Sequence, residues 1–323
     1  MQLDVFALLC LAEWLNQELA GSYAQKLRIV HPQIYRLKIY VPGKGNRYLY
    51  FDLSGLIYYG KTLGETHSAE NRFVQRANKY LADSRIEKVE LVNFDRILRF
   101  RFSGEADLIF ECMPRGNLVL VSKEGKILAA AMEAALRDRK IIPGEQYMPP
   151  PKQLDTPKKY SRLGLSKQIL EQILRRDRCY LYYVQEQLVD ILPFKINDLH
   201  PSAVIEEVAA PLPEVLFSFT GKLLFEKIQE FQASIKQSQL TKQTKLLEHL
   251  KRNLEQLEKK KEEIEKAIEF IENNYDKLEQ LIEILRKKLD EGEAAAQEFL
   301  RQISGGKARL VREKDGLKLE IEK

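Results

Sequence analysis

The pattern of apolar and polar positions near the N-terminus predicts one helix followed by a series of strands. Apolar residues recur at helical spacing from Val5 to Leu19, with Asp4 placed to cap the helix and Gly21 to end it. Runs that alternate with a two-residue period follow, which is typical of strands with one buried face. These runs lie at residues 33–41, 47–53, 86–92, 96–102, 107–112, 117–121 and 126–132.

A second helix, at about residues 69–82, interrupts the strands. Its apolar residues Phe73, Ala77 and Leu81 fall on one face, and its basic residues lie on the opposite face. The short connections rich in Gly, Pro and Asn are typical of hairpin loops, so the strands are expected to be antiparallel. Residues 1–154 are therefore predicted to form an α+β domain with an antiparallel, β-rich core, which ends at a proline-rich linker.

Residues 155–213 carry short helical patterns. The clearest of them, "LGLSKQILEQILRR" at residues 163–176, follows a turn that contains glycine. We expect a small all-α module here. A helix-hairpin-helix arrangement, whose tight turn presents backbone amides to phosphate, fits this length.

A heptad pattern dominates residues 214–303 and predicts a long coiled-coil arm. The seam positions are Leu247, Leu250, Leu254, Leu257, Lys261, Ile264, Ile268, Ile271, Tyr275, Leu278, Ile282, Leu285 and Leu289. Lys261 is the one polar exception and is expected to lie near a carboxylate or to reach water. No returning heptads follow before residues 304–323, which read as a short β-hairpin. We therefore expect a fragment of a longer protein whose arm pairs with a second copy or a neighbour.

Charge is distributed unevenly over the chain. Residues 1–154 hold 22 Lys and Arg against 17 Asp and Glu, and this surplus accounts for the whole net charge of +5. No acidic residue occurs between Glu18 and Asp52. The basic residues there alternate with tyrosines 35, 40, 48 and 50. Such a surface favours nucleic acid as a partner, and the alternative is an ordinary solvated face of a sheet.

The candidate chemistry is limited. Cys10, Cys112 and Cys179 lie far apart in apolar settings and are expected to be buried thiols of a reducing compartment. The first apolar run lacks the basic start of a signal peptide and is too short to span a bilayer. The chain has neither a phosphate loop nor a nucleophile elbow, and its four histidines share no ligand spacing. We expect a cytoplasmic protein that is not an enzyme, holds no metal or cofactor and contacts no membrane.

The stretch "VNFDRILRFRF", residues 92–102, places Asp95 and Arg96 at the opening of a strand. A turn aspartate followed by a solvated arginine is the simplest interpretation. An arginine held in a turn also offers a planar fork that suits phosphate or the edge of a base.

Several ordered motifs together identify a family. They are "LDVFALLCLAEWLNQELAGSYAQKLRI", "FDRILRFRF", "LIFECMPRGNLVLVSKEGKIL" and "RDRKIIPGEQYMPPP". In this order they resemble the N-terminal domain of the NFACT family of ribosome-associated quality-control factors, and "RGN" at residues 115–117 resembles its archaeal and eukaryotic branch. The resemblance implies an N-terminal domain similar to that of formamidopyrimidine-DNA glycosylases, then a helix-hairpin-helix module and an antiparallel coiled coil.

The same resemblance implies a function without catalysis. Such a factor binds a stalled large ribosomal subunit that carries peptidyl-tRNA, and it recruits aminoacyl-tRNA, in this family alanyl-tRNA, for template-free C-terminal tailing. Asp4, Asp95 and Arg96 match the residues that bind tRNA, with Asn93 where the family has glycine. The basic residues assigned to ribosomal RNA and other phosphates are Arg36, Lys38, Arg115, Arg137 and Arg139.

Two other classes of protein fit parts of the sequence. The long heptad pattern also suits a coiled-coil scaffold or an adhesin-like binding protein that recruits no tRNA. A glycosylase-like enzyme would need an N-terminal proline amine, but this chain begins Met1-Gln2-Leu3.

Overall fold

The structure is a computed structural model that describes residues 3–64, 70–150, 177–193, 195, 202–305, 307–313 and 316–321. The chain divides into two compact units, Met1–Gln237 and Ser238–Lys323. The long helix α5 (Leu212–Asn273) contributes residues to both units.

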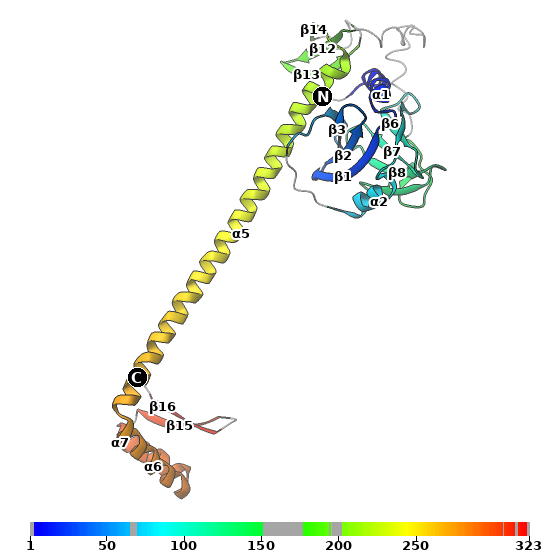
Figure 1. Ribbon diagram of the computed structural model, residues 1–323. Coiled ribbons are helices and arrows are strands. Elements are labelled where there is room, and N and C mark those ends of the chain that lie inside the picture. Colours follow the sequence, from blue (N-terminus) through cyan, green and yellow to red (C-terminus); the bar gives the residue numbers. More distant parts are fainter. Residues whose placement is uncertain are drawn as a thin grey trace. The chain divides into compact units, whose positions relative to one another are not determined.

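The first unit opens with a helix and a four-stranded antiparallel sheet (Figure 1). Helix α1 (Val5–Leu19) begins where the sequence predicts, with the Asp4 side chain accepting a hydrogen bond from the Phe6 N–H at 3.0 Å. The strands of the first sheet are neighbours in sequence and in space. They are β1 (Tyr23–His31), β2 (Ile34–Val41), β3 (Gly45–Asp52) and β4 (Leu56–Gly60).

A second antiparallel sheet follows helix α2 (Arg72–Leu81). Its strands also run in sequence order. They are β5 (Ile86–Leu91), β6 (Ile97–Phe102), β7 (Ala106–Glu111), β8 (Leu118–Ser122) and β9 (Ile127–Ala130). A two-stranded ribbon, β10 (Ala134–Ala135) and β11 (Lys140–Ile141), comes next. The described part of residues 1–154 is thus α+β with antiparallel sheets, as the sequence predicts.

The main core lies between the inner faces of the two sheets, with α1 and α2 packed against it. Phe51 of the first sheet contacts Phe100 and Phe110 of the second, with ring centroids 5.5 and 5.2 Å apart. The sheets also meet along the backbone, because the Ile86 N–H donates to the Ser22 carbonyl at 2.7 Å. This hydrogen bond fixes the start of β5 to the residue just before β1, although the two are far apart in the sequence.

The outer face of the second sheet buries two carboxylates, Asp107 and Glu111, each 1% exposed. Arg99 and Lys123 form ion pairs with Asp107, at 2.7 and 2.8 Å. The Arg139 guanidinium forms an ion pair with the Glu111 carboxylate. The sequence indicates no partners for these carboxylates, because their cations lie elsewhere in the chain, on β6, just after β8 and just before β11, and become neighbours only in the folded sheet.

The middle region differs from its prediction. Its described part forms a three-stranded sheet, β13 (Gln187–Leu192), β12 (Cys179–Val184) and β14 (Val204–Val208), in that order, so an all-α module is wrong for these residues. Strand β12 is buried on both faces, with Leu181 in the main core and Tyr182 in a small separate cluster. A continuous apolar run of this kind cannot be distinguished from a buried helix by periodicity alone. The predicted helix at residues 163–176 lies outside the described residues.

The first turns of α5 join the main core, and the turns that follow pack on the outer face of the first sheet. Leu224 and Ile228 join Val30, Ile34 and Tyr50 in a buried cluster. The Lys227 ammonium lies 2.7 Å from a carboxylate oxygen of Asp52, which is fully buried. Polar and apolar contacts together fix residues 224–228 of α5, called here the root of α5, to the sheet.

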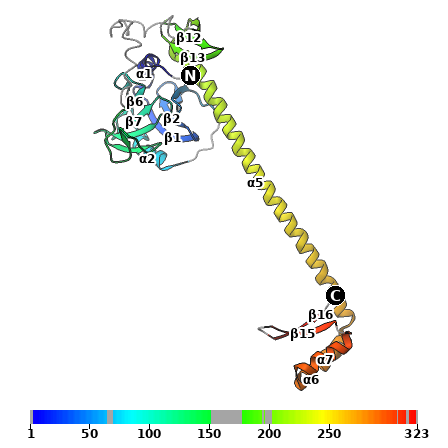
Figure 2. The ribbon, with the colours of Figure 1, turned by 180° about the vertical axis from the view of Figure 1, so that it is seen from behind.

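The second unit contains the remainder of α5 and four further elements. They are α6 (Tyr275–Glu291), α7 (Glu293–Ser304), β15 (Ala308–Glu313) and β16 (Gly316–Ile321), the last two paired as an antiparallel hairpin. Leu285 packs with Ala296, Leu300 and Ala308 in a small core. The two views in Figures 1 and 2 show α6 beside α7.

The heptad pattern is helical, but it does not form one helix to Leu289. Helix α5 ends at Asn273, because Asn274 leaves the helical conformation with φ −122° and ψ 16°. Lys261 lies 3.6 Å from Glu265, which confirms the expected nearby carboxylate. The α5 seam is exposed within this chain. Its exposed fractions run from 49% to 65% at Leu247, Leu250, Leu254, Leu257, Ile264, Ile268 and Ile271.

Candidate RNA-binding site

The turn before β6 has an unusual backbone. Asn93 and Phe94 both adopt positive φ, 54° and 51°, a region that asparagine enters more easily than most residues and that glycine favours. The Asp95 N–H donates to the Val92 carbonyl at 3.0 Å, and the Asp95 carboxylate accepts from the Arg96 N–H at 2.7 Å. Asp95 therefore helps to fix the backbone of the turn, and Asn93 supplies the conformation that the family's glycine would give.

Phe94 connects this turn to the first helix. Its ring stands edge-on to Phe6, with centroids 5.5 Å apart. Phe6 is also the residue whose N–H the Asp4 side chain accepts. Asp4 lies two residues before Phe6, and Asp95 and Arg96 follow Phe94 directly, so one aromatic contact brings the helix start and the turn together.

The loop after β7 lies next to Arg96. The Cys112 N–H donates to the Arg96 carbonyl at 2.8 Å. Arg115 is exposed in this loop with φ 58°. At Gly116 a Cβ atom would stand 2.0 Å from the Glu111 carbonyl oxygen, so only glycine fits beside Arg115. Arg137 is also exposed and lies between β10 and β11.

Arg139 does not fit its predicted role in RNA binding. It is 8% exposed, and its guanidinium forms two parallel hydrogen bonds with Glu111, the longer at 2.9 Å. The Tyr147 hydroxyl donates to the same carboxylate at 3.0 Å. Burial raises the pKa of Tyr147, and the Glu111 carboxylate raises it further. Arg139 is an internal ion-pair partner and is not available to phosphate.

Arg36 and Lys38 lie on the outer face of β2, on the other sheet from the turn. The Arg36 guanidinium stands over the Tyr48 ring, 5.1 Å from its centroid. Of the four tyrosines, Tyr35 faces the core, and Tyr50 is fully buried with the contacts of α5. Tyr40 is 44% exposed. The basic and aromatic surface expected here is therefore smaller than the sequence indicates.

The cysteines are poorly placed to act as nucleophiles. The three cysteines are free and buried, as predicted, and burial raises the pKa of each, to about 11 at Cys179. Thiols held in this state are poor nucleophiles. In the part of the chain that the structure describes, no three His, Cys, Asp or Glu residues gather into a possible metal site. None of its helices combines the length and apolarity that crossing a bilayer requires.

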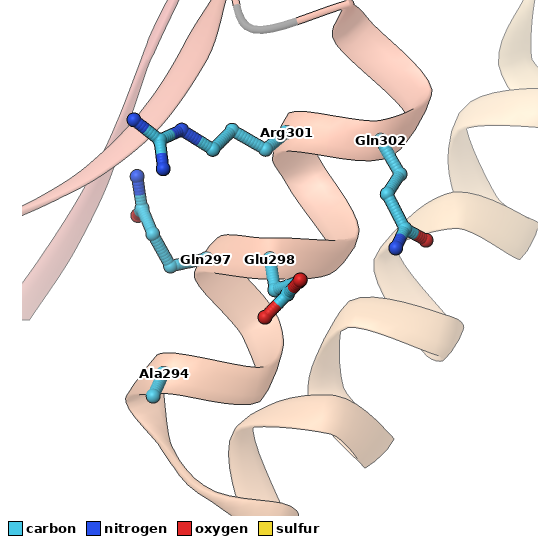
Figure 3. Close-up of a pocket in the computed structure, with 5 residues that line it drawn as sticks. All are labelled: Ala294, Gln297, Glu298, Arg301 and Gln302. Atoms are coloured by element: carbon cyan, nitrogen blue, oxygen red, sulfur yellow. The ribbon is translucent and has the colours of Figure 1, made fainter.

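A hollow of about 530 Å³ lies along α7 in the second unit. Figure 3 shows its lining side chains, Ala294, Gln297, Glu298, Arg301 and Gln302. The Gln297 side chain accepts from the Leu310 N–H at 2.7 Å and so ties α7 to the hairpin. One acid and one base on a single helix face define no ligand chemistry.

Comparison with known proteins identifies the family. Residues 4–188 match the family model described as NFACT N-terminal and middle domains. The chain therefore belongs to the NFACT family.

Named relatives occur in an archaeon and in a bacterium. The archaeal Rqc2 homolog aRqcH of Methanocaldococcus jannaschii is 32% identical over 120 residues, which cover 36% of this chain and 18% of that protein. The Rqc2 homolog RqcH of Streptococcus pneumoniae serotype 2 is 30% identical over 166 residues, covering 47% of this chain and 30% of that protein. The chain thus matches less than a third of each relative's length.

Solved structures with similar arrangements come from bacteria. One is the N-terminal domain of fibronectin-binding protein PavA from Streptococcus pneumoniae. The match covers 67% of this chain and 97% of the PavA domain, with 20% identity and a TM-score of 0.44. The fibrinogen-binding protein from Staphylococcus aureus matches 67% of this chain and 98% of its own, with 16% identity and a TM-score of 0.48.

Proposed function

We propose that this protein is an RNA-binding factor of ribosome-associated quality control and not an enzyme. In this proposal it binds large ribosomal subunits that carry peptidyl-tRNA, and it recruits aminoacyl-tRNA for template-free C-terminal tailing of the nascent chain. Membership of the NFACT family and the Rqc2 names of its relatives support this role. The Phe6–Phe94 contact is the main structural support for this role, because the contact brings Asp4 beside the turn that contains Asp95 and Arg96.

Each residue of this tRNA site has a distinct task. The Arg96 guanidinium offers a planar fork to a phosphate or a base edge, while the Asp95 and Asp4 carboxylates accept hydrogen bonds from amino groups on bases. All three residues belong to a rigid element boundary and not to a long loop, so the site is preorganised. Arg115 and Arg137 are exposed in two other loops and would bind ribosomal RNA, as would Arg36 and Lys38 on the first sheet.

Crosslinking of the full-length protein in cells, followed by sequencing of the attached RNA, tests this function. The proposal predicts enrichment of tRNA, with alanine tRNAs foremost, and of RNA from the large ribosomal subunit. Crosslinks to messenger RNA alone, or none above background, would contradict it.

A coiled-coil scaffold is the second candidate function, and the exposed apolar seam of α5 favours it. A scaffold would be recovered with protein partners and without RNA. The same crosslinking experiment therefore separates the two functions.

A further inference from the structure

Helix α2 carries a stripe of three exposed cations, Arg72, Arg76 and Lys79, called here the α2 stripe. The opposite face of the helix buries Phe73, Val74, Ala77 and Leu81 in the main core. The helix is thus fixed to the domain by its apolar face, and the stripe extends along about 10 Å of its axis at 1.5 Å per residue.

The α2 stripe makes no ion pair with a carboxylate in the described part of the chain, unlike many other cations of the first unit. Lys88 and Arg101 share Glu90, for example, and Lys44 pairs with Glu18. Arg72 and Arg76 stand one helical turn apart, a spacing at which like charges repel. The Arg76 guanidinium is held in place by a hydrogen bond to the Leu128 carbonyl at 2.7 Å. A bound anion would relieve this repulsion.

A hollow of about 540 Å³ lies beside the α2 stripe. Its far wall comes from the end of β9 and the segments after it, where the half-buried Pro143 gives a small apolar surface beside the buried Ala129 and Ala130. Among the described residues of the lining, Glu133 is the single acid. The hollow thus combines a row of cations, an apolar wall and one carboxylate acceptor.

We infer that the α2 stripe and this hollow bind single-stranded RNA at a surface separate from the turn of Asp95 and Arg96. Phosphates lie along the α2 stripe, because three cations in a row, without a carboxylate partner among the described residues, complement consecutive phosphates. A base rests on the apolar wall, and Glu133 accepts from its exocyclic amino group, which favours cytosine or adenine over uracil. The inference goes beyond the proposed function, since it assigns a second RNA-binding surface that contains none of the residues proposed for tRNA or ribosomal RNA.

A titration with fluorescent single-stranded RNA oligonucleotides at several salt concentrations tests the inference on the whole chain. The test variant is Arg72→Gln with Lys79→Gln, and glutamine keeps the helix propensity high. The control is Lys61→Gln with Lys126→Gln, which removes the same charge at two exposed lysines in loops outside α2. Melting curves establish that both variants are folded.

The inference predicts that the test variant binds an oligocytidine about tenfold more weakly, with its salt slope reduced by about 1.4, while the control binds like the wild type. Glu133→Gln should reduce the preference for oligocytidine over oligouridine. Equal weakening in both double variants, or no binding of either oligonucleotide by the wild type, would overturn it, as would displacement by an acidic peptide but not by RNA. The test variant should still bind tRNA through the turn of Asp95 and Arg96, so a pull-down of tRNA distinguishes failure of this inference from failure of tRNA recruitment.

Discussion

Phe94 stands edge-on to Phe6, with ring centroids 5.5 Å apart and ring planes 80° apart. Phe94 is 44% exposed and has φ 51°, an unfavourable conformation for a bulky residue. Strained residues of this kind concentrate at functional sites, where the surrounding structure holds them. The contact therefore links the strain in the turn to the position of α1, and it turns two distant sequence motifs into one surface.

Replacement of Phe94 tests this link. Phe94→Ala should lower the free energy of unfolding by about 0.5–1.5 kcal/mol, the usual value of an aromatic pair, and should weaken tRNA binding. Met132→Ala, at a side chain 41% exposed on another loop, should change stability by less than about 0.5 kcal/mol. Urea denaturation measures both. A Phe94→Ala protein with unchanged stability and tRNA affinity would show that the contact positions nothing.

Arg139 and Arg137 offer a matched pair for testing burial. Arg139→Met leaves the Glu111 carboxylate buried without its cation, so we expect a loss of about 3–5 kcal/mol in the free energy of unfolding. Arg137→Met, two residues away and exposed, should cost less than about 0.5 kcal/mol. Similar midpoints in urea for the two variants would contradict the buried ion pair.

The root of α5 should respond to acid through His31, whose ring stands 5.0 Å from that of Phe231. Burial lowers the pKa of His31 from 6.5, while the Asp52 carboxylate opposes this and the Lys227 ammonium adds to it. The unfolded chain then binds the proton more tightly than the folded one. The contribution of neutral His31 is present above about pH 6.5 and is lost as the pH falls toward the lower folded-state pKa.

Melting temperatures measured between pH 7 and pH 5 check this prediction. The wild type should lose stability over that interval, and His31→Gln should show a flatter profile because it has no proton to gain. Identical pH profiles for the two proteins would show that protonation of His31 does not cause the loss of stability.

The exposed seam of α5 should drive pairing of the helix. We expect this chain to form dimers, because exposed leucines at heptad spacing need a facing helix. Leu250→Glu with Leu257→Glu should give a monomer, whereas Lys251→Glu beside the seam should not. Light scattering over a range of concentrations distinguishes these cases, and a wild-type chain that stays monomeric throughout would rule out self-pairing.

Periodicity predicts the strands of this fold where the two-residue alternation is regular, and it fails at β1 and at the continuously apolar β12. The pattern in β2 and β6 identifies both strands. Strand β1 escapes detection because register shifts between Ala24 and Leu27 and between Ile29 and His31 break its alternation. At the first irregularity the Asn78 side chain pairs with the Leu27 backbone. It accepts from the Leu27 N–H at 2.7 Å and donates to the Leu27 carbonyl at 3.0 Å. Such long-range pairing leaves no local signal.

The candidate site shows the same division. Asp4 is visible as a helix cap, and Asp95 as a turn residue, because both act on backbone nearby in sequence. Phe94 was not predicted as a site residue, although an aromatic residue inside a polar turn is the signal that could have revealed it. Arg139 resembles a surface cation in the sequence, because nothing local shows that Glu111, 28 residues earlier, lies beneath it.

Titration of tRNA with charge-conserving or shape-conserving variants of the turn tests the central claim most directly. Asp95→Asn keeps the acceptor for the Arg96 N–H and removes only the charge, and Arg96→Lys keeps the charge and removes the planar fork. We expect both variants to have a free energy of unfolding within about 0.5 kcal/mol of the wild type and to bind tRNA at least about tenfold more weakly. Arg115→Gln should retain tRNA binding. Folded Asp95→Asn and Arg96→Lys proteins that bind tRNA with wild-type affinity would contradict this claim.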